Sequence, residues 1–448
     1  MLVFISDLHF VDGTAGEHNI PSRAFEYFFD DLVAIAHKPT NKIKEIKIVL
    51  LGDIFDLLRT ENWFDYPVEE RPWGHKEDAI EIHALTIFDG IVDHDKNPET
   101  FQLIKDGLKR LQDECPHLEA EPRLIYRPGN HDRLCNKYRR LRQKVCDCLG
   151  LLPSWHNPDQ PFPHDHLDPR YGVLARHGHE FDKFNYEGGN SYTFADYQRV
   201  PIGDPITTEL VARLPYTLEK NLKASSQELW PHLSEQEIAD EIHRIERNFQ
   251  EIENVRPFSA IPEWLLYQVQ ENRPLKEVIE DTVDEVLTYF ENLDFVKDWY
   301  SRHDKWTEWR DEADQIQALL FILRNFKLYR TEKLWDLSVK AKDFFVKDKF
   351  IKAAADEYLP LDLGIRYVVY GHTHEPLVVP LGTVPGSPLP LEQVYLNTGT
   401  WRTRYQKATR DASFISWKNM TFVIFYREDE RHSRFPVFES WTGTLKSI

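Results

Sequence analysis

The sequence predicts an α/β fold that is interrupted by a large, mostly helical insertion, and three observations support this. Short apolar runs alternate with helical stretches over residues 1–184. Strand signals nearly vanish over residues 185–360, and they return over residues 361–448. Alternating strands and helices are typical of layered α/β proteins. We therefore expect residues 1–184 and 361–448 to form one core, and residues 185–360 to form a helical insertion that is a candidate cap.

Apolar runs and helical spacing define the elements of the first region. Strands are expected at residues 2–6, 46–51, 123–126 and 173–176, and helices at residues 23–37, 77–94 and 100–115. In the first of these helices, Phe25, Phe28, Phe29 and Leu32 recur at helical spacing, which gives the helix one buried face.

Helix signals dominate the insertion. Ser234 and Glu237 have the spacing of a capping box, so a helix is expected to begin there. Apolar residues over 275–290 recur at helical spacing and indicate a second packing face. Further helices are expected at residues 311–328 and 333–345.

Strands return in the last region. Residues 365–370, 393–396, 413–417 and 420–426 are expected to be strands, with a turn at Lys418-Asn419 between the last two. These strands are expected to complete the sheets that the first region begins.

Five short segments carry Asp, Asn and His directly after predicted strands. They are Ser6-Asp7-Leu8-His9, Gly52-Asp53-Ile54-Phe55-Asp56, Gly129-Asn130-His131-Asp132, His177-Gly178-His179 and Gly371-His372-Thr373-His374. These side chains bind hard and borderline divalent cations. One such segment often occurs by chance, but five in this arrangement indicate a two-metal hydrolytic site.

Spacing within the segments indicates how the side chains converge. Asp7 and His9 are two residues apart, so at a strand end they point the same way and can reach one ion. The carboxylate of Asp53 can bridge two cations, and the Asn130 carbonyl is a neutral ligand. His131 follows Asn130 and cannot easily reach the same metal, which frees it for proton chemistry.

The ordered pattern D-x-H, G-D-x-x-D, G-N-H-D, H and G-H-x-H resembles that of the calcineurin-like metallophosphoesterases. All five blocks are intact, and the resemblance covers residues 1–184 and 361–445 but not the insertion. It implies a four-layer α-β-β-α sandwich with a binuclear site at the strand ends.

The resemblance also implies the role of each residue. The first metal would be held by Asp7, His9, Asp53 and His374, and the second by Asp53, Asn130, His177 and His372. His131 would be the proton donor, and Asp56 would orient it. Either His177 or His179 could supply the ligand of the fourth block. We favour His177, which is nearer the strand end and matches the family's block.

This site predicts a metal-dependent phosphoesterase. Two cations about 3.5–4 Å apart clamp a phosphoryl group and lower the pKa of a water that attacks phosphorus, while His131 protonates the leaving group. Oxygen and imidazole ligands without thiolate suit Mn²⁺, Fe, Zn²⁺ or Ni²⁺ better than Ca²⁺, and we favour Mn²⁺.

Charge limits the substrate. The net charge of −19 argues against a broad nucleic-acid surface, so a small or medium-sized phosphomonoester or phosphodiester is favoured. Arg402 and Arg404 either neutralise a second phosphate or are surface residues. The basic stretch at residues 133–144 is either a solvated helix face or a polyanion site. A nuclease of the same fold is therefore the alternative, and a non-catalytic scaffold is less favoured because every ligand is present.

The sequence favours a cytoplasmic protein. Residues 2–5 are too short for the apolar region of a signal peptide, and no run approaches the roughly 18 apolar residues of a membrane span. The four cysteines are expected to be free thiols. We expect a phosphate-ester substrate and no membrane partner.

Overall fold

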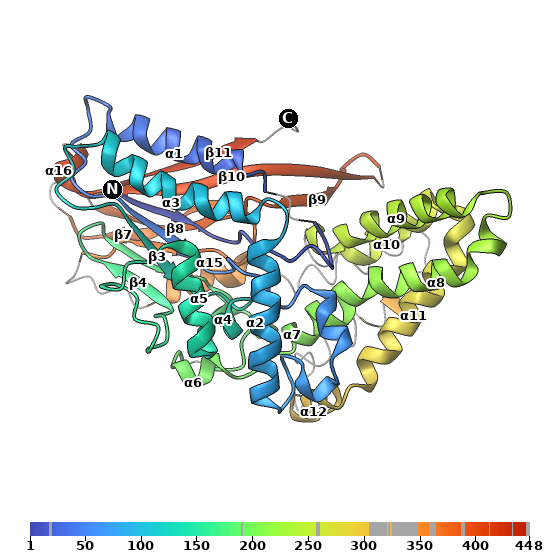
Figure 1. The fold of residues 1–448 in the computed structure, drawn as a ribbon. Coiled ribbons are helices and arrows are strands. Elements are labelled where there is room, and N and C mark those ends of the chain that lie inside the picture. The colour runs from blue at the N-terminus through green and yellow to red at the C-terminus, as the bar shows by residue number, and fades with distance from the viewer. Residues whose placement is uncertain are drawn as a thin grey trace.

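The computed structural model has two mixed β-sheets with helices packed around them, which confirms the α/β class (Figure 1). It describes residues 1–17, 20–189, 191–256, 260–303, 320, 323–324, 347–357, 364–386, 390–411, 413–431 and 433–444. The expected helices at 311–328 and 333–345 lie outside these residues, apart from three positions of the first.

The first sheet joins the two ends of the chain. Its strand order is β11-β10-β1-β2-β3, and β9 pairs with β10 beside this path. The strands are β1 (Leu2–Ile5), β2 (Lys47–Leu51), β3 (Arg123–Arg127), β9 (Thr403–Lys407), β10 (Phe414–Tyr426) and β11 (Val437–Thr444). β1, β2 and β3 are parallel, whereas β10 runs antiparallel to β1 with Leu2 opposite Phe425. The last region thus completes a sheet that the first region begins, as expected.

The second sheet has the order β4-β5-β6-β8-β7. Its strands are β4 (Asp165–Asp168), β5 (Val173–Arg176), β6 (Tyr367–Tyr370), β7 (Pro376–Val384) and β8 (Leu391–Thr398). β5, β6 and β8 are parallel, so β5 of the first region pairs with β6 of the last.

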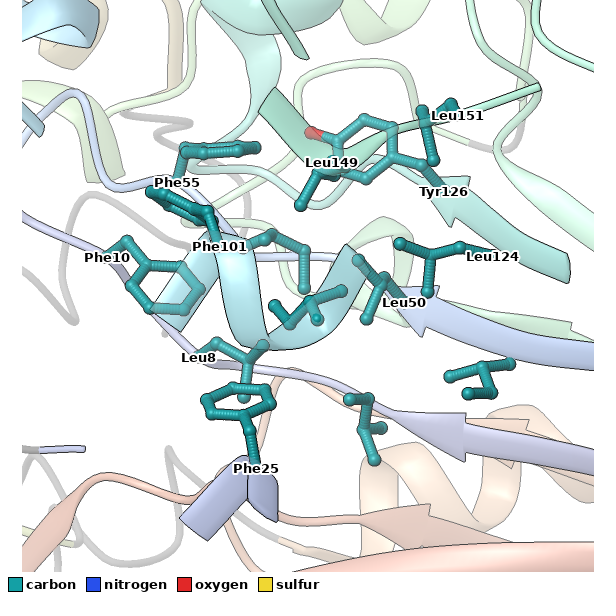
Figure 2. Close-up of a cluster of buried hydrophobic side chains, with 14 of the residues drawn as sticks. Leu8, Phe10, Phe25, Leu50, Phe55, Phe101, Leu124, Tyr126, Leu149 and Leu151 are labelled. Atoms are coloured by element: carbon teal, nitrogen blue, oxygen red, sulfur yellow. The ribbon is translucent and has the colours of Figure 1, made fainter. Parts of the chain in front are cut away.

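Both faces of the first sheet are buried along β1, β2 and β3, because alternate residues of these strands enter different cores. Val3 and Ile5 belong to the core that includes residues of four helices, whereas Leu2 and Phe4 pack against the second sheet. Figure 2 shows part of the first of these cores, including Phe25, Leu50 and Phe101. The four helices are α1 (Arg23–Ala36), α2 (Glu77–Asp93), α3 (Asn97–Glu114) and α5 (Arg139–Leu149). The apolar face expected for residues 23–37 is buried on this sheet.

A further helix covers part of the second sheet. In α15 (Lys347–Asp356), Phe350 and Ala354 pack against Val368 and Tyr370 of β6. α15 thus packs on the second sheet, although its residues fall within the predicted insertion. The exact limits of the insertion stay a prediction.

Residues 194–303 are largely helical and have a separate hydrophobic core (Figure 1). The longer helices are α8 (Arg213–Leu229), α9 (Glu235–Gln250), α10 (Ile261–Glu271), α11 (Lys276–Asn292) and α12 (Asp294–His303). The capping box of Ser234 and Glu237 begins α9 as expected. We call residues 194–303, apart from the undescribed 257–259, the helical lobe.

Short helices connect the larger elements. Those in the core are η1 (Glu61–Asp65), η2 (Val68–Glu70), α4 (Arg133–Lys137), η3 (His179–Phe181) and α16 (Glu428–Arg431). Those in the helical lobe are α6 (Phe194–Tyr197), α7 (Gly203–Ile206), the π-helical η4 (Thr207–Ala212), η5 (Glu251–Asn254) and η7 (Arg273–Leu275).

The expected turn at Lys418-Asn419 is wrong, because β10 continues through both residues. Lys418 pairs with Thr403 of β9, and Asn419 pairs with Thr444 of β11. β9 pairs with β10 up to Lys418, and β11 pairs with it from Asn419 onward, so backbone pairing keeps two residues that favour turns in an extended strand.

Among the residues that the structure places, no helix combines the length and the apolar character that crossing a membrane requires.

Candidate metal centre

The five polar segments meet because their strands end at a common edge. β1, β2 and β3 are parallel neighbours in one sheet, and β5 and β6 are parallel neighbours in the other. Main-chain hydrogen bonds join the loops that follow: the Asp7 amide donates to the Gly52 carbonyl, and the Gly371 amide donates to the His177 carbonyl, both at 3.0 Å. The His372 amide donates to the Asp7 carboxylate at 3.1 Å, which links the sheets.

The first group of side chains able to hold a metal is Asp7, His9, Asp53 and His374. One ligand atom from each lies within 4.8 Å of the others, and all four residues are buried. His374 Nε2 is 3.3 Å from Asp7 Oδ1, and His9 Nε2 is 3.7 Å from Asp53 Oδ2. This is the set that the sequence predicts for the first metal.

The second group is Asp53, His177 and His372, so Asp53 belongs to both groups. His177 Nε2 is 3.1 Å from Asp53 Oδ2. Asn130, the fourth predicted ligand, donates its side-chain N–H to Asn185 Oδ1 at 3.3 Å. Its buried Oδ1 has no hydrogen-bond partner among the described residues, which suits an oxygen that ligates a cation.

Three of the four imidazoles that are predicted ligands are oriented by a hydrogen bond from the nitrogen that faces away from the group. His9 Nδ1 donates to Asp56 Oδ2 at 2.9 Å, and His177 Nδ1 donates to the Leu51 carbonyl at 2.9 Å. His372 Nε2 donates to Asp182 Oδ2 at 3.0 Å. Such bonds fix the tautomer that leaves the other ring nitrogen free to bind a metal.

Unusual backbone conformations also gather at this site. In the described part of the chain, six non-glycine residues have positive φ, and five of them are predicted metal ligands. Those five are Asp7, His9, Asp53, His372 and His374. Residues other than Gly, Asn and Asp rarely adopt this region, and the strain persists mainly where function requires the geometry.

Two glycines allow the loops to approach closely. A Cβ atom on Gly52, whose φ is +86°, would lie 2.3 Å from His177 Nδ1. A Cβ atom on Gly129 would lie 2.3 Å from Asp53 Oδ1. Both distances are shorter than atoms can approach, so these positions require glycine.

The buried carboxylates govern protonation at the site. Burial favours neutral His131, but the carboxylates of Asp56 and Asp53 outweigh this effect and raise the pKa of His131 to about 10. Burial likewise opposes charge on Asp56, whose pKa is nevertheless lowered because His131 and His9 both donate to it. Asp56 thus favours the imidazolium form of His131, whose Nδ1 donates to Asp56 Oδ1 at 2.8 Å.

The structure separates His177 from His179. His179 belongs to neither group that includes Asp53, nor to the third group of potential ligands, which is His9, Asp56 and His131. Its ring centre lies 5.4 Å from that of His177. Neither ring nitrogen of His179 has a hydrogen-bond partner among the described residues, and burial lowers its pKa to about 3. His177 is thus the histidine of this segment that faces Asp53.

Arg402 and Arg404 are buried rather than exposed on the surface. Arg402 Nη1 lies 3.8 Å from Glu253 Oε2. Burial lowers the pKa of Arg404, and Glu375 opposes that effect. Both side chains thus lie within the protein and not among its solvated charges.

Three polar residues near the site were not anticipated from the sequence. Asp182 orients His372, and Asn185 contacts Asn130. Both follow the His177 segment by a few residues, so a search for polar side chains near each motif would have found them. Arg256 of the helical lobe donates to His374 Nδ1 at 2.8 Å, and no local pattern around it indicates this contact.

The donor set fits divalent cations. Carboxylate oxygens, imidazole nitrogens and one amide oxygen face one another without a thiolate, which suits Mn²⁺, Fe²⁺, Zn²⁺ or Ni²⁺. Comparisons of the chain with models of protein families and with curated proteins gave no match. The chain therefore has buried clusters of His and Asp that could hold metal ions.

Proposed function

We propose that this protein is a binuclear metal-dependent phosphoesterase of the calcineurin-like type. The observation that carries the proposal is the position of Asp53, whose carboxylate belongs to two adjoining groups of potential ligands. A carboxylate shared in this way is what a site for two neighbouring cations requires.

The packing of the layers supports the fold that accompanies this function. One face of the first sheet packs on α1, α2, α3 and α5, and the other packs on the second sheet. α15 packs on the second sheet through Phe350. We propose a four-layer α-β-β-α sandwich interrupted by an insertion at residues 185–360.

Two ions would be held by the chain's own side chains. Asp7, His9, Asp53 and His374 would hold the first, and Asp53, Asn130, His177 and His372 the second. When bound, divalent cations at these positions, with Mn²⁺ favoured, would stabilise charge on the phosphoryl oxygens and lower the pKa of the attacking water.

His131 is proposed to protonate the leaving group. Its Nδ1 donates to Asp56, so the acidic proton is the one on Nε2. The His131 side chain is 15% exposed and that of Asp56 is fully buried, so the imidazole is the member of the pair that can reach a substrate. Asp56 fixes the ring and favours its charged form, as a general acid requires.

The substrate is proposed to be a small or medium-sized phosphomonoester or phosphodiester. The nuclease alternative would use the basic stretch, but four of its six basic side chains already pair with carboxylates: Arg133, Lys137, Arg139 and Lys144. Lys137 pairs with Glu77, and Lys144 pairs with Asp89. Paired cations release few counterions from nucleic acid, so they contribute little to its binding.

A panel of reconstituted proteins tests the proposal. Metal-depleted protein is loaded with Mn²⁺, Fe²⁺, Zn²⁺ or Ni²⁺ and assayed with p-nitrophenyl phosphate, bis(p-nitrophenyl) phosphate and a single-stranded oligonucleotide. We expect hydrolysis of at least one chromogenic ester. Cleavage of the oligonucleotide alone would favour the nuclease, and inactivity on all three would favour a scaffold.

A pair of aspartate variants provides the control for this panel. Asp53→Asn removes the shared carboxylate, and we expect it to lose metal from both positions together with activity. Asp95→Asn makes the same change at an exposed aspartate that also has positive φ but lies outside the metal groups. It should keep both metal and activity.

A further inference from the structure

Four arginines gather beside the candidate metal centre, and we call them the arginine cluster: Arg59, Arg256, Arg402 and Arg404. Arg59 Nε lies 2.7 Å from Glu253 Oε2, and Arg402 Nη1 lies 3.8 Å from the same atom. Arg256 Nη1 donates to the Glu253 carbonyl. The positive charge of Arg404 acts on Arg256, as does that of Arg59.

The arginine cluster adjoins the metal groups directly. Arg256 donates through Nη2 to Nδ1 of His374, a predicted ligand of the first metal, at 2.8 Å. The negative charge of Asp7 acts on Arg256, and the charges of Asp56 and His131 act on Glu253. An anion held by the metal centre would therefore lie next to these guanidinium groups.

Positive charge is in excess in this part of the molecule. Glu253 and Glu375 face the arginine cluster, and Asp7, which also faces it, would be neutralised by a bound cation. Arg402 is only 4% exposed, and its buried Nη2 has no hydrogen-bond partner among the residues that the structure describes. Buried cations are costly unless they are paired, so an anion would relieve this imbalance.

The contact between Arg256 and His374 differs from those of the other ligand histidines. His9, His177 and His372 each donate from the ring nitrogen that faces away from the metal group, whereas Nδ1 of His374 accepts from a guanidinium. The Arg256 guanidinium therefore lies directly against the imidazole of His374, at the border between the arginine cluster and the first group.

We infer that the arginine cluster is a subsite for a second anionic group of the substrate. Resting on the proposed function, this inference names the substrate class as a phosphate ester that carries a second phosphate besides the one that is cleaved. Arg256 would donate to that phosphate together with Arg402 and Arg404. The helical lobe, which supplies Arg256, thus takes part in substrate choice.

The first test measures binding without catalysis. Metal-free protein in EDTA is titrated calorimetrically with inorganic pyrophosphate, and inorganic phosphate serves as the single-anion comparison. We expect pyrophosphate to bind more tightly than phosphate. Arg402→Gln and Arg404→Gln should each weaken pyrophosphate binding roughly tenfold or more, because each removes a charged hydrogen-bond donor.

Two controls distinguish a binding role from a structural one. Arg139→Gln removes an exposed arginine that pairs with Asp159 and should leave pyrophosphate affinity unchanged. Arg402→Lys restores the charge and should recover part of the affinity. If the glutamine variants lowered the melting temperature but left pyrophosphate affinity unchanged, the arginines would be purely structural and the inference would be wrong.

The second test separates this inference from the proposed function. Metal-loaded wild type and Arg256→Gln are assayed with glucose 6-phosphate and glucose 1,6-bisphosphate. We expect wild type to prefer the bisphosphate in kcat/KM and the variant to lose that preference mainly through KM. Hydrolysis of both sugars without preference overturns the inference alone. Hydrolysis of neither overturns the proposed function, whereas the binding test still decides the subsite.

Discussion

Asp56 accepts hydrogen bonds from two histidines, His131 and His9, for which different roles are proposed. Its Oδ1 accepts from His131 and its Oδ2 accepts from His9, so one carboxylate orients the proposed acid and a proposed metal ligand together. Because both bonds favour the ionised carboxylate, Asp56 stays charged, and it also keeps His131 protonated. Proton donation and metal binding are therefore coupled through a single side chain.

Replacing His131 tests this division of work. His131→Asn should retain both metals, because His131 is not among the groups that include Asp53, and it should lower kcat about 10²–10⁴-fold, the usual contribution of a general acid. Elemental analysis and steady-state kinetics check the two halves of the prediction. A variant with normal metal content and full turnover would show that another group supplies the proton.

His156 should make stability depend on pH. Burial, reinforced by Arg127, lowers its pKa to about 4, and the Tyr126 amide donates to its Nε2 at 3.1 Å. Because the folded-state pKa lies below the unfolded value, this contribution is present above about pH 6.5 and is lost as pH falls toward 4. The loss should be on the order of 2–3 kcal/mol.

Urea unfolding between pH 4.5 and 7.5 checks this expectation. His156→Gln keeps a side-chain acceptor but does not titrate, so the difference in unfolding free energy between wild type and variant should shrink as the pH falls. Parallel curves for the two proteins would assign the acid sensitivity to other groups.

At the scale of elements, the proposed ligands lie in loops that follow strands, and five of the seven have positive φ. Gly52→Ala tests this arrangement. The new Cβ would lie 2.3 Å from His177 Nδ1 at a residue with φ of +86°. The left-handed backbone alone costs about 1–2 kcal/mol for a residue with a side chain, and the clash adds to it. We expect reduced metal content and a lower melting temperature.

A second glycine provides the control. Gly443 lies in β11, and a Cβ atom there meets nothing within 4 Å. Gly443→Ala should leave the metal content unchanged. If Gly52→Ala also bound metal normally, the close approach of the two loops would not matter for the site.

Elements with strong local patterns could be predicted from the sequence. The helix at Arg23–Ala36 has its own apolar face, and the predicted ligands lie in short segments directly after apolar strands. By contrast, β11 and the course of β10 depend on partner strands, because Lys418 and Asn419 stay extended only through pairing with β9 and β11. Arg256 could not be predicted, since its amide is held by the Tyr405 carbonyl, a distant residue.

At the scale of the molecule, bound metal should stabilise the packing of the two sheets. The first group takes Asp7 and Asp53 from loops of one sheet and His374 from a loop of the other. Ions that bind only the folded chain add about 2.7 kcal/mol when they are present at 100 times their Kd. Dialysis against EDTA should therefore lower the melting temperature, and added Mn²⁺ should restore it.

The Asp53→Asn variant distinguishes stabilisation by ions at the proposed site from other effects of EDTA on the melting temperature. Asp53→Asn should melt at nearly the same temperature with and without EDTA, because it has lost the ions beforehand. A decrease on chelation as large as that of wild type would show that the stabilising ions bind elsewhere.

The distance along the chain between ligands has a consequence for biosynthesis. His9 and His374 contact each other across 365 positions of sequence. A nascent chain that ends before β6 contains Asp7, Asp53 and His177. It lacks His372 and His374, which follow β6 and complete the two groups. Both proposed metal positions are therefore complete only after synthesis has passed His374.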